Sequence, residues 1–244
     1  MGPSNAHLRV VAIDGPAAAG KTTVASRVAA RLGAMLFDTG ALYRAVTLAA
    51  QRAGLADEDA GAIANLTRRL AIDLSPPSVD DGRQLDVRLD GEDVTWAIRS
   101  DEVDRHVSAI AAQPEVRQAL LPIQRRIAAG ERVVMVGRDI GSVVIPDAGI
   151  KVYLDASAEE RARRRFQELR DRGFEVKYES VLADTRARDA FDTNRPVAPL
   201  RVASGAEVVE TDGRSIEEVV DSIVDLAHRR WNDAAFSATT AGAR

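Results

Sequence analysis

The chain has no cysteine and only three histidines among its 244 residues, and both shortages limit its chemistry. Without cysteine it can form no disulfide framework and no thiolate metal site, and it has no thiol nucleophile. The histidines, His7, His106 and His228, are scattered along the chain. The sequence therefore argues against a structural zinc site.

Long hydrophobic runs are also missing. No apolar stretch approaches the roughly 18 residues that a membrane span needs, and no cationic start followed by an apolar segment marks a leader. We therefore expect a cytoplasmic protein with no membrane partner. The formal net charge of −4 argues against a general nucleic-acid binder, although clustered arginines can still form a local anion site.

Lysine is scarce, because the chain uses arginine for nearly every cation except Lys21, Lys151 and Lys177. Lys21 lies in the segment G-P-A-A-A-G-K-T, which fits the pattern G-x-x-x-x-G-K-[ST] and follows the apolar run Val10–Ile13. A compact ammonium fits inside a tight anion loop where a planar guanidinium does not. The segment predicts a phosphate-binding loop (P-loop) for a nucleoside triphosphate.

Each residue type in this loop has a task. The glycines let backbone N–H groups turn towards the phosphates, Lys21 can reach the β and γ oxygens, and the Thr22 hydroxyl can ligate Mg²⁺. The predicted nucleotide-binding residues are Gly15, Pro16, Ala17, Ala18, Ala19, Gly20, Lys21, Thr22 and Thr23.

The remaining hydrophobic pattern alternates between short apolar runs and amphipathic segments. It predicts an α/β fold, a doubly wound parallel sheet with helices on both faces and ligands at the carboxyl ends of the strands. An Asp90-Gly91 hairpin and a Ser215–Glu218 capping box add local signals. Strands are expected at Val10–Ile13, Met35–Phe37, Arg132–Val136, Lys151–Leu154 and Val208–Val209, and helices at Ala41–Arg52, Asp57–Leu70, Ser100–Ala112, Pro114–Ala129 and Ala158–Arg172.

The character of the chain changes between residues 55 and 112, where polar helices surround the expected hairpin. We predict one unit over residues 8–230, with a core of 8–54 and 130–230, an inserted lobe over about 55–112 and a short helical lid over about 156–173. Residues 1–7 and 231–244 are expected to be an unstructured start and a flexible tail.

A second group of polar residues follows the later strands. Thr39 and Arg44 follow the second strand and Arg138 follows the third, while R-D-x-x-D-x-x-R lies at Arg188–Arg195. Arginine suits phosphate because its fork donates two hydrogen bonds in one plane. Two phosphate-bearing ligands imply phosphoryl transfer.

Several blocks, in order, resemble the bacterial cytidylate kinases within the nucleoside monophosphate kinases. They are I-D-G-P-A-A-A-G-K-T, D-T-G-A-L-Y-R, G-R-D-I-G, V-I-P-D-A, E-E-R-A-R-R-R and R-D-x-x-D-x-x-R-x-x-x-P-L, and the resemblance covers about Val10 to Ala227. The family implies an inserted monophosphate-binding lobe, ATP as donor with Mg²⁺, CMP and dCMP as acceptors, and a monomer.

The resemblance also implies residue roles. Thr39, Arg44, Arg138 and Arg195 would hold the acceptor phosphate, and Arg188 and Asp192 would contact the pentose. Ser108, Arg117 and Asp139 would recognise cytosine. This base presents one amino donor beside two acceptors, so a site that recognises it needs a carboxylate to accept from the amino group and hydrogen-bond donors for the acceptors. Lid residues Arg161, Arg164 and Arg165 would close over the triphosphate, and the catalytic set would be Lys21, Arg138, Arg195 and Arg164.

Plainer interpretations stay open for several of these residues. Taken alone, Arg117 fits a solvated helix face, Ser108 a surface hydroxyl, and Arg188–Arg195 a structural salt-bridge segment. The lid helix could be surface too, but like charges at Arg161 and Arg165 repel at i,i+4, which favours bound anions.

One position departs from the family pattern. Many relatives carry an acidic residue before G-R-D, and here that residue is Val136. Asp14 and Asp38 are the nearest substitutes by sequence for orienting a metal-bound water.

Two other functions remain open, a kinase for UMP, AMP or another small acid, and a nucleotide-binding regulator whose arginines bind a polyanion.

Overall fold

The computed structural model describes residues 7–129, 132–171 and 173–241, with side chains up to residue 231 at the carboxyl end. The start predicted to be unstructured lies outside this range up to residue 6. The chain divides into two compact units. The first unit comprises residues 1–34 and 131–244, and the second comprises residues 35–130.

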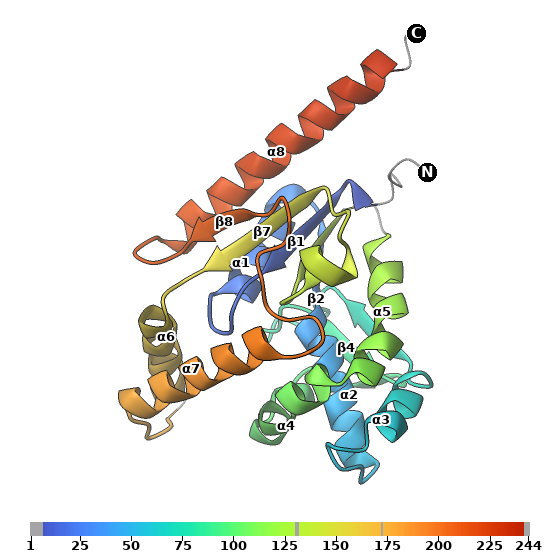
Figure 1. The fold of residues 1–244 in the computed structure, drawn as a ribbon, viewed down its shortest axis with the longest axis vertical. Coiled ribbons are helices and arrows are strands. Elements are labelled where there is room, and N and C mark those ends of the chain that lie inside the picture. Colours follow the sequence, from blue (N-terminus) through green and yellow to red (C-terminus); the bar gives the residue numbers. More distant parts are fainter. Residues whose placement is uncertain (1–6, 130–131, 172, 242–244) are drawn as a thin grey trace. The chain divides into compact units, whose positions relative to one another are not determined.

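The first unit is built on a parallel sheet whose strands run in the order β6-β1-β7-β8. β1 is buried at all five positions, as its unbroken apolar run predicts. Figure 1 shows β1, β7 and β8 side by side. The strands are β1 (Val10–Asp14), β6 (Val133–Val136), β7 (Ile150–Asp155) and β8 (Glu207–Glu210).

Helices flank this sheet, which confirms the predicted α/β class. Helix α1 (Lys21–Leu32) contacts β6 and α8 (Ile216–Ala241), and α8 contacts β7. The capping box forms as predicted, since Ser215 N–H donates to the Glu218 carboxylate at 2.8 Å. The final helix continues to Ala241, further than we expected, and the flexibility predicted for residues 231–244 stays a prediction.

Helix α7 (Tyr178–Asn194) packs against α6 (Ala158–Asp171) and was not expected. Its amphipathic pattern is weak, because only Val181 and Asp192 are buried along it. A short π-helix, η3 (Ile140–Val144), contacts β1 and was also missed. Helices α6 and α7 carry five of the arginines and carboxylates singled out above, Arg161, Arg164, Arg165, Arg188 and Asp192.

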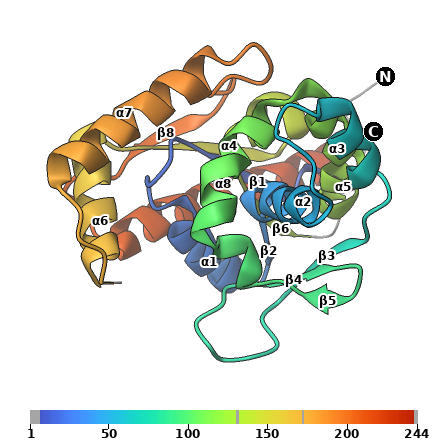
Figure 2. The ribbon, with the colours of Figure 1, turned by 90° about the horizontal axis from the view of Figure 1, so that it is seen from below.

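The second unit joins four helices to a small antiparallel sheet (Figure 2). Helix α2 contacts α4, and α3 contacts α5. The unit contains more than the lobe of residues 55–112, because β2, α2 and α5 belong to it as well. Its elements are β2 (Met35–Asp38), α2 (Thr39–Arg52), α3 (Ala60–Thr67), β3 (Ile72–Ser75), β4 (Asp86–Leu89), β5 (Glu92–Asp93), η2 (Ala97–Arg99), α4 (Asp101–Ala112) and α5 (Pro114–Ala128).

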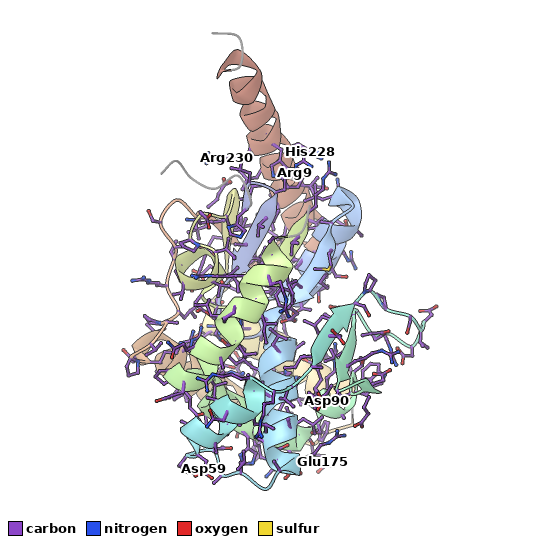
Figure 3. All side chains as sticks on the ribbon, turned by 90° about the vertical axis from the view of Figure 1, so that its right-hand side faces the viewer. Arg9, Asp59, Asp90, Glu175, His228 and Arg230 are labelled. Carbon is purple, nitrogen blue, oxygen red and sulfur yellow. The ribbon has the colours of Figure 1, made fainter. Side chains whose placement is uncertain are left out.

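The hairpin between β4 and β5 turns at Asp90 and Gly91, as predicted. Both residues have positive φ, 51° and 86°, which is the backbone that a tight primed turn requires. Asp90, labelled in Figure 3, accepts a hydrogen bond from Ala71 N–H at 2.8 Å. The turn is thereby tied to the segment before β3.

Within the described part of the chain, no helix combines the length and apolarity needed to cross a membrane.

Candidate functional site

The loop between β1 and α1 has the backbone that the glycine pattern predicts. Gly15 has φ of 150°, and a Cβ there would lie 2.2 Å from the carbonyl oxygen of Leu154. Gly20 caps α1 with φ of 82° in the left-handed region. Only glycine suits these positions, and the first turn of α1 then presents the positive end of the helix dipole to an anion.

Lys21 and Thr22 begin this helix, and both are half-buried. The Lys21 ammonium donates to the Pro16 carbonyl at 2.6 Å, so it lies back across the loop. Thr23 is exposed on the same turn. The loop therefore brings a cation, a hydroxyl and a helix N-terminus together, which is the equipment for holding phosphate.

Asp14 ends β1 just before the loop and is almost fully buried, with 3% of its surface exposed. Its two carboxylate oxygens accept backbone N–H bonds from Ile140 and Gly141, each at 2.8 Å. Burial raises the pKa of Asp14 to about 6, although these two bonds act in the opposite direction. Asp14 thus ties β1 to η3 with both oxygens.

We expect this carboxyl to titrate close to pH 6 in the folded protein. Because burial raises its pKa above the ordinary 3.8, the folded state holds the proton more tightly than the unfolded state. The stabilisation from this group is therefore fully present below about pH 4 and is lost as the pH rises through 6. A carboxyl ¹³C titration by NMR, with Asp14→Asn to assign the signal, measures this pKa; titration near pH 4 would contradict it.

At the carboxyl end of β6, Arg138 and Asp139 meet Asp192 and Arg195 from the end of α7. Arg138 pairs with Asp192 at 2.6 Å, and Arg195 lies 3.8 Å from Asp139. Arg195 also donates to the Ala198 carbonyl at 2.5 Å. Three of these four side chains are at most 6% exposed, so the charges depend on one another for compensation.

This ion-pair cluster, Arg138, Asp139, Asp192 and Arg195, brings together two segments that are far apart in the sequence. Arg188 lies half-buried on the same helix as Asp192. The ion pairs agree with the structural salt-bridge interpretation and equally with an anion site, because a bound phosphate can replace a carboxylate as the partner of a guanidinium.

The three lid arginines have different surroundings. Arg164 donates to Glu160 and to both the hydroxyl and the carbonyl of Thr211. Arg165 pairs with Glu168 at 2.7 Å. The repulsion expected between Arg161 and Arg165 is no support for bound anions, because each arginine pairs with a carboxylate of the chain itself.

Arg161 is buried, and its main partner is Asp189, a residue to which the sequence analysis gave no role. Asp189 belongs to the R-D-x-x-D-x-x-R block, so the signal was present. What was missing was the packing of α7 on α6, which places the two residues together.

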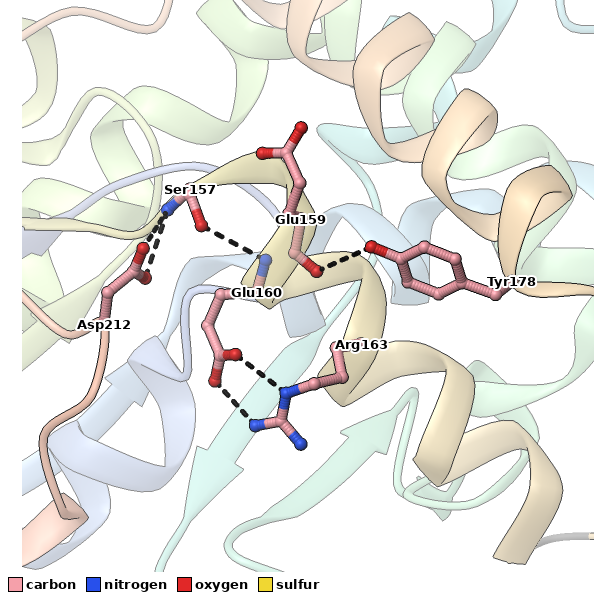
Figure 4. Close-up of a pocket in the computed structure, with 6 residues that line it drawn as sticks. All are labelled: Ser157, Glu159, Glu160, Arg163, Tyr178 and Asp212. Atoms are coloured by element: carbon pink, nitrogen blue, oxygen red, sulfur yellow. Dashed lines mark hydrogen bonds and ion pairs between the residues drawn. The ribbon is translucent and has the colours of Figure 1, made fainter.

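Figure 4 shows an open hollow where α6 begins. Its carboxylates already have partners, since Asp212 accepts from Ser157 N–H at 3.1 Å and Glu160 pairs with Arg163 at 2.8 Å. Three acidic side chains make the hollow unsuited to phosphate. Its lining is Ser157, Glu159, Glu160, Arg163, Tyr178 and Asp212, none of which is a predicted site residue.

The second unit holds the other predicted acceptor residues. Arg117 is buried, with its guanidinium 5.4 Å from the Tyr43 ring centroid and a 3.0 Å bond to the Ala111 carbonyl, so the solvated-face interpretation is wrong. Arg44 pairs with Asp104 at 2.5 Å. Thr39 is buried at the start of α2, and Ser108 is half-buried on α4.

No group of three or more histidine, aspartate or glutamate side chains in the described residues could hold a metal ion. Asp38 accepts from Gly40 N–H at 2.9 Å and caps α2. The donors present suit a Mg²⁺ that arrives with its nucleotide, because Mg²⁺ keeps several waters and binds substrate phosphates with one or two protein oxygens. The Thr22 hydroxyl is the oxygen ligand that would suit this Mg²⁺, because Thr22 follows Lys21 in the first turn of α1.

The model of the family described as cytidylate kinase matches residues 11–229 of this chain. A cytidylate kinase of Herpetosiphon aurantiacus is 49% identical over 216 residues, which cover 88% of this chain and 93% of that protein. A cytidylate kinase of Caldanaerobacter subterraneus is 47% identical over 219 residues, which cover 90% and 94%. A third, from Aeromonas salmonicida, is 42% identical over 228 residues, which cover 93% and 97%. A match of this extent shows that the protein belongs to the cytidylate kinase family.

Proposed function

We propose that this protein transfers the γ-phosphoryl group of Mg·ATP to the 5′-phosphate of CMP or dCMP, giving ADP with CDP or dCDP. The observation that carries the proposal is the ion-pair cluster of Arg138, Asp139, Asp192 and Arg195, because a triphosphate-binding loop alone would also serve a hydrolase or a switch. The family of the chain indicates the cytidine nucleotides. A monomeric state and a cytoplasmic location belong to the same proposal.

On the donor side, the loop residues Gly15 to Gly20 would surround the β and γ phosphates with backbone N–H groups. Lys21 would leave the Pro16 carbonyl, its partner in this structure, and reach the β and γ oxygens. Mg²⁺, held by the Thr22 hydroxyl, would supply charge neutralisation on the phosphates. Arg164 is the lid arginine proposed to act on the transferring group, and Arg165 would close over the nucleotide.

On the acceptor side, Arg138 and Arg195 are proposed to bind the CMP phosphate, exchanging carboxylate partners for the substrate. Thr39 and Arg44 would add a hydroxyl and a third guanidinium. Asp192 and Arg188 would then contact the pentose. Asp139 would accept from the cytosine amino group, and Ser108 and Arg117 would donate to the ring acceptors.

The reaction needs no covalent enzyme intermediate, because the acceptor is already an oxyanion. The bond from the γ phosphorus to the β-bridging oxygen breaks as a CMP phosphate oxygen bonds to that phosphorus, and the electron pair leaves on ADP. The protein's part is to hold the two anions in line and to stabilise charge on the equatorial oxygens. Lid closure would exclude water and so prevent hydrolysis.

A coupled assay of ADP release tests the proposal. It uses Mg·ATP with CMP, dCMP, UMP, AMP or no acceptor. Strong turnover with CMP and dCMP over a negligible blank is expected. Turnover with UMP or AMP alone would select another kinase on the same scaffold. An equal rate with and without acceptor, together with salt-sensitive oligonucleotide binding, would favour a nucleotide-binding regulator.

Asp139→Ala is expected to reduce discrimination between CMP and UMP more than it reduces turnover. The loss of a charged hydrogen-bond acceptor for the cytosine amino group lowers kcat/KM for CMP by about a hundredfold, whereas UMP, which has no such amino group, loses less. The ratio of the two kcat/KM values measures the effect. Asp147→Ala, an exposed carboxylate bonded to His7, is the control. An equal loss for both acceptors would contradict a base-reading role.

A further inference from the structure

Arg161, in the predicted lid, is buried and makes several hydrogen bonds within the protein. Its side chain is 5% exposed, and four of its hydrogen bonds are seen. Nε donates to the Ala156 carbonyl at 3.0 Å, and the two terminal nitrogens reach the Asp189 carboxylate at 2.8 and 2.5 Å. The fourth bond runs to the Ala17 carbonyl at 3.2 Å. A guanidinium has five N–H groups, so most of its donors are used within the protein.

The bond to Ala17 matters because Ala17 lies inside the phosphate-binding loop. The next residue, Ala18, has φ of 60°, a left-handed backbone that alanine rarely adopts. Such a conformation persists only where the surrounding structure holds it. Arg161 donates to the carbonyl of Ala17, which directly precedes this strained residue. A hydrogen bond to that carbonyl fixes the plane of the peptide between Ala17 and Ala18 and therefore the direction of the N–H in the same peptide.

Asp189 connects the same arginine to the acceptor side. It lies on α7 next to Arg188 and three residues before Asp192, both proposed to contact the pentose. The bidentate pair is therefore a direct link from the helix carrying these residues to the loop expected to hold the donor phosphates. Arginine suits this link because its planar fork fixes orientation as well as distance.

We propose that Arg161 and Asp189 form a positioning pair, which holds the phosphate-binding loop in its nucleotide-ready conformation through the Ala17 carbonyl and joins it to α7. Arg161 acts through the loop and not by contact with the triphosphate. This inference rests on the proposed function only in naming ATP as the loop's ligand.

A second ion pair between the same two helices provides a matched control. Arg186 on α7 pairs with Glu159 on α6 at 2.6 Å, but both side chains are more than half exposed and neither bonds to the loop. Removing Arg186 takes away a cross-helix charge pair without touching Ala17. A general loosening of α6 from α7 would appear in both variants, whereas a loss of loop positioning would appear only for the buried pair.

The experiment measures the Kd of Mg·ATP by calorimetry, without acceptor, in wild type, Asp189→Asn and Arg186→Ala. We expect about tenfold weaker binding in Asp189→Asn and no change in Arg186→Ala. Unchanged binding in Asp189→Asn would overturn the proposal, and so would tighter binding, which is the result expected if a released Arg161 reached the phosphates. A wild type that binds no ATP would instead refute the proposed function.

Arg161→Met combined with Asp189→Leu separates positioning from stability. Exchanging a buried ion pair for apolar residues of similar size often restores stability, but it leaves the Ala17 carbonyl without its donor. We therefore expect a melting temperature close to that of wild type together with weakened ATP binding. Recovery of both properties would show that the pair is only structural and would overturn the inference.

Discussion

Replacing Lys21 with methionine is expected to lower kcat for CMP phosphorylation roughly a thousandfold, or about 4 kcal/mol in the activation barrier. Methionine has nearly the length of lysine and no charge, so the change removes the ammonium and little else. The proposed reaction brings two anions together, and Lys21 places a positive charge in the first turn of α1. Coupled ADP release measures the loss.

Folding should survive this change. Lys21 is half-buried, and the Pro16 carbonyl that accepts its hydrogen bond can be served by water instead. The matched control is Lys177→Met, at the residue just before α7, which removes an equal charge from the same unit and should leave kcat unchanged. If Lys21→Met kept more than about a tenth of wild-type kcat, the electrostatic role assigned to the loop lysine would be wrong.

The loop could be predicted because its information is local. Gly15 and Gly20 are needed by the backbone of the loop itself, and β1 and α1 adjoin it in sequence, so a pattern of eight residues specifies strand, turn and helix. The Asp90-Gly91 turn and the Ser215 cap were predictable for the same reason.

What could not be predicted depends on packing between distant segments. Helix α7 was missed since a helix that buries only Val181 and Asp192 leaves little hydrophobic periodicity to detect. Without α7, nothing in the sequence shows that Asp189 neutralises Arg161, 28 residues earlier. Arg117 appeared solvated for a similar reason, because its contact with Tyr43 comes from a different helix.

The ion pair between Arg138 and Asp192 determines how the proposed binding of the CMP phosphate by Arg138 can be tested. Arg138→Met is expected to lower kcat/KM for CMP about a thousandfold, because a bidentate donor to the acceptor phosphate is lost. The Kd of ATP, which does not depend on this residue, should stay unchanged. Arg138→Lys keeps the charge but not the fork and should recover only part of the loss. A lysine variant with full activity would contradict recognition by the planar fork.

Stability must be separated from binding here, since Arg138 also compensates Asp192. The Asp192 side chain is 5% exposed, so losing its partner leaves a buried carboxylate that costs about 2 kcal/mol in the free energy of unfolding. Adding Asp192→Asn to Arg138→Met removes that charge and should restore the melting temperature. Phosphorylation of CMP should be no higher than in the single variant, because neutralising Asp192 replaces no contact to the phosphate and weakens the proposed contact to the pentose. If activity returned together with stability, Arg138 would hold the fold and not the acceptor.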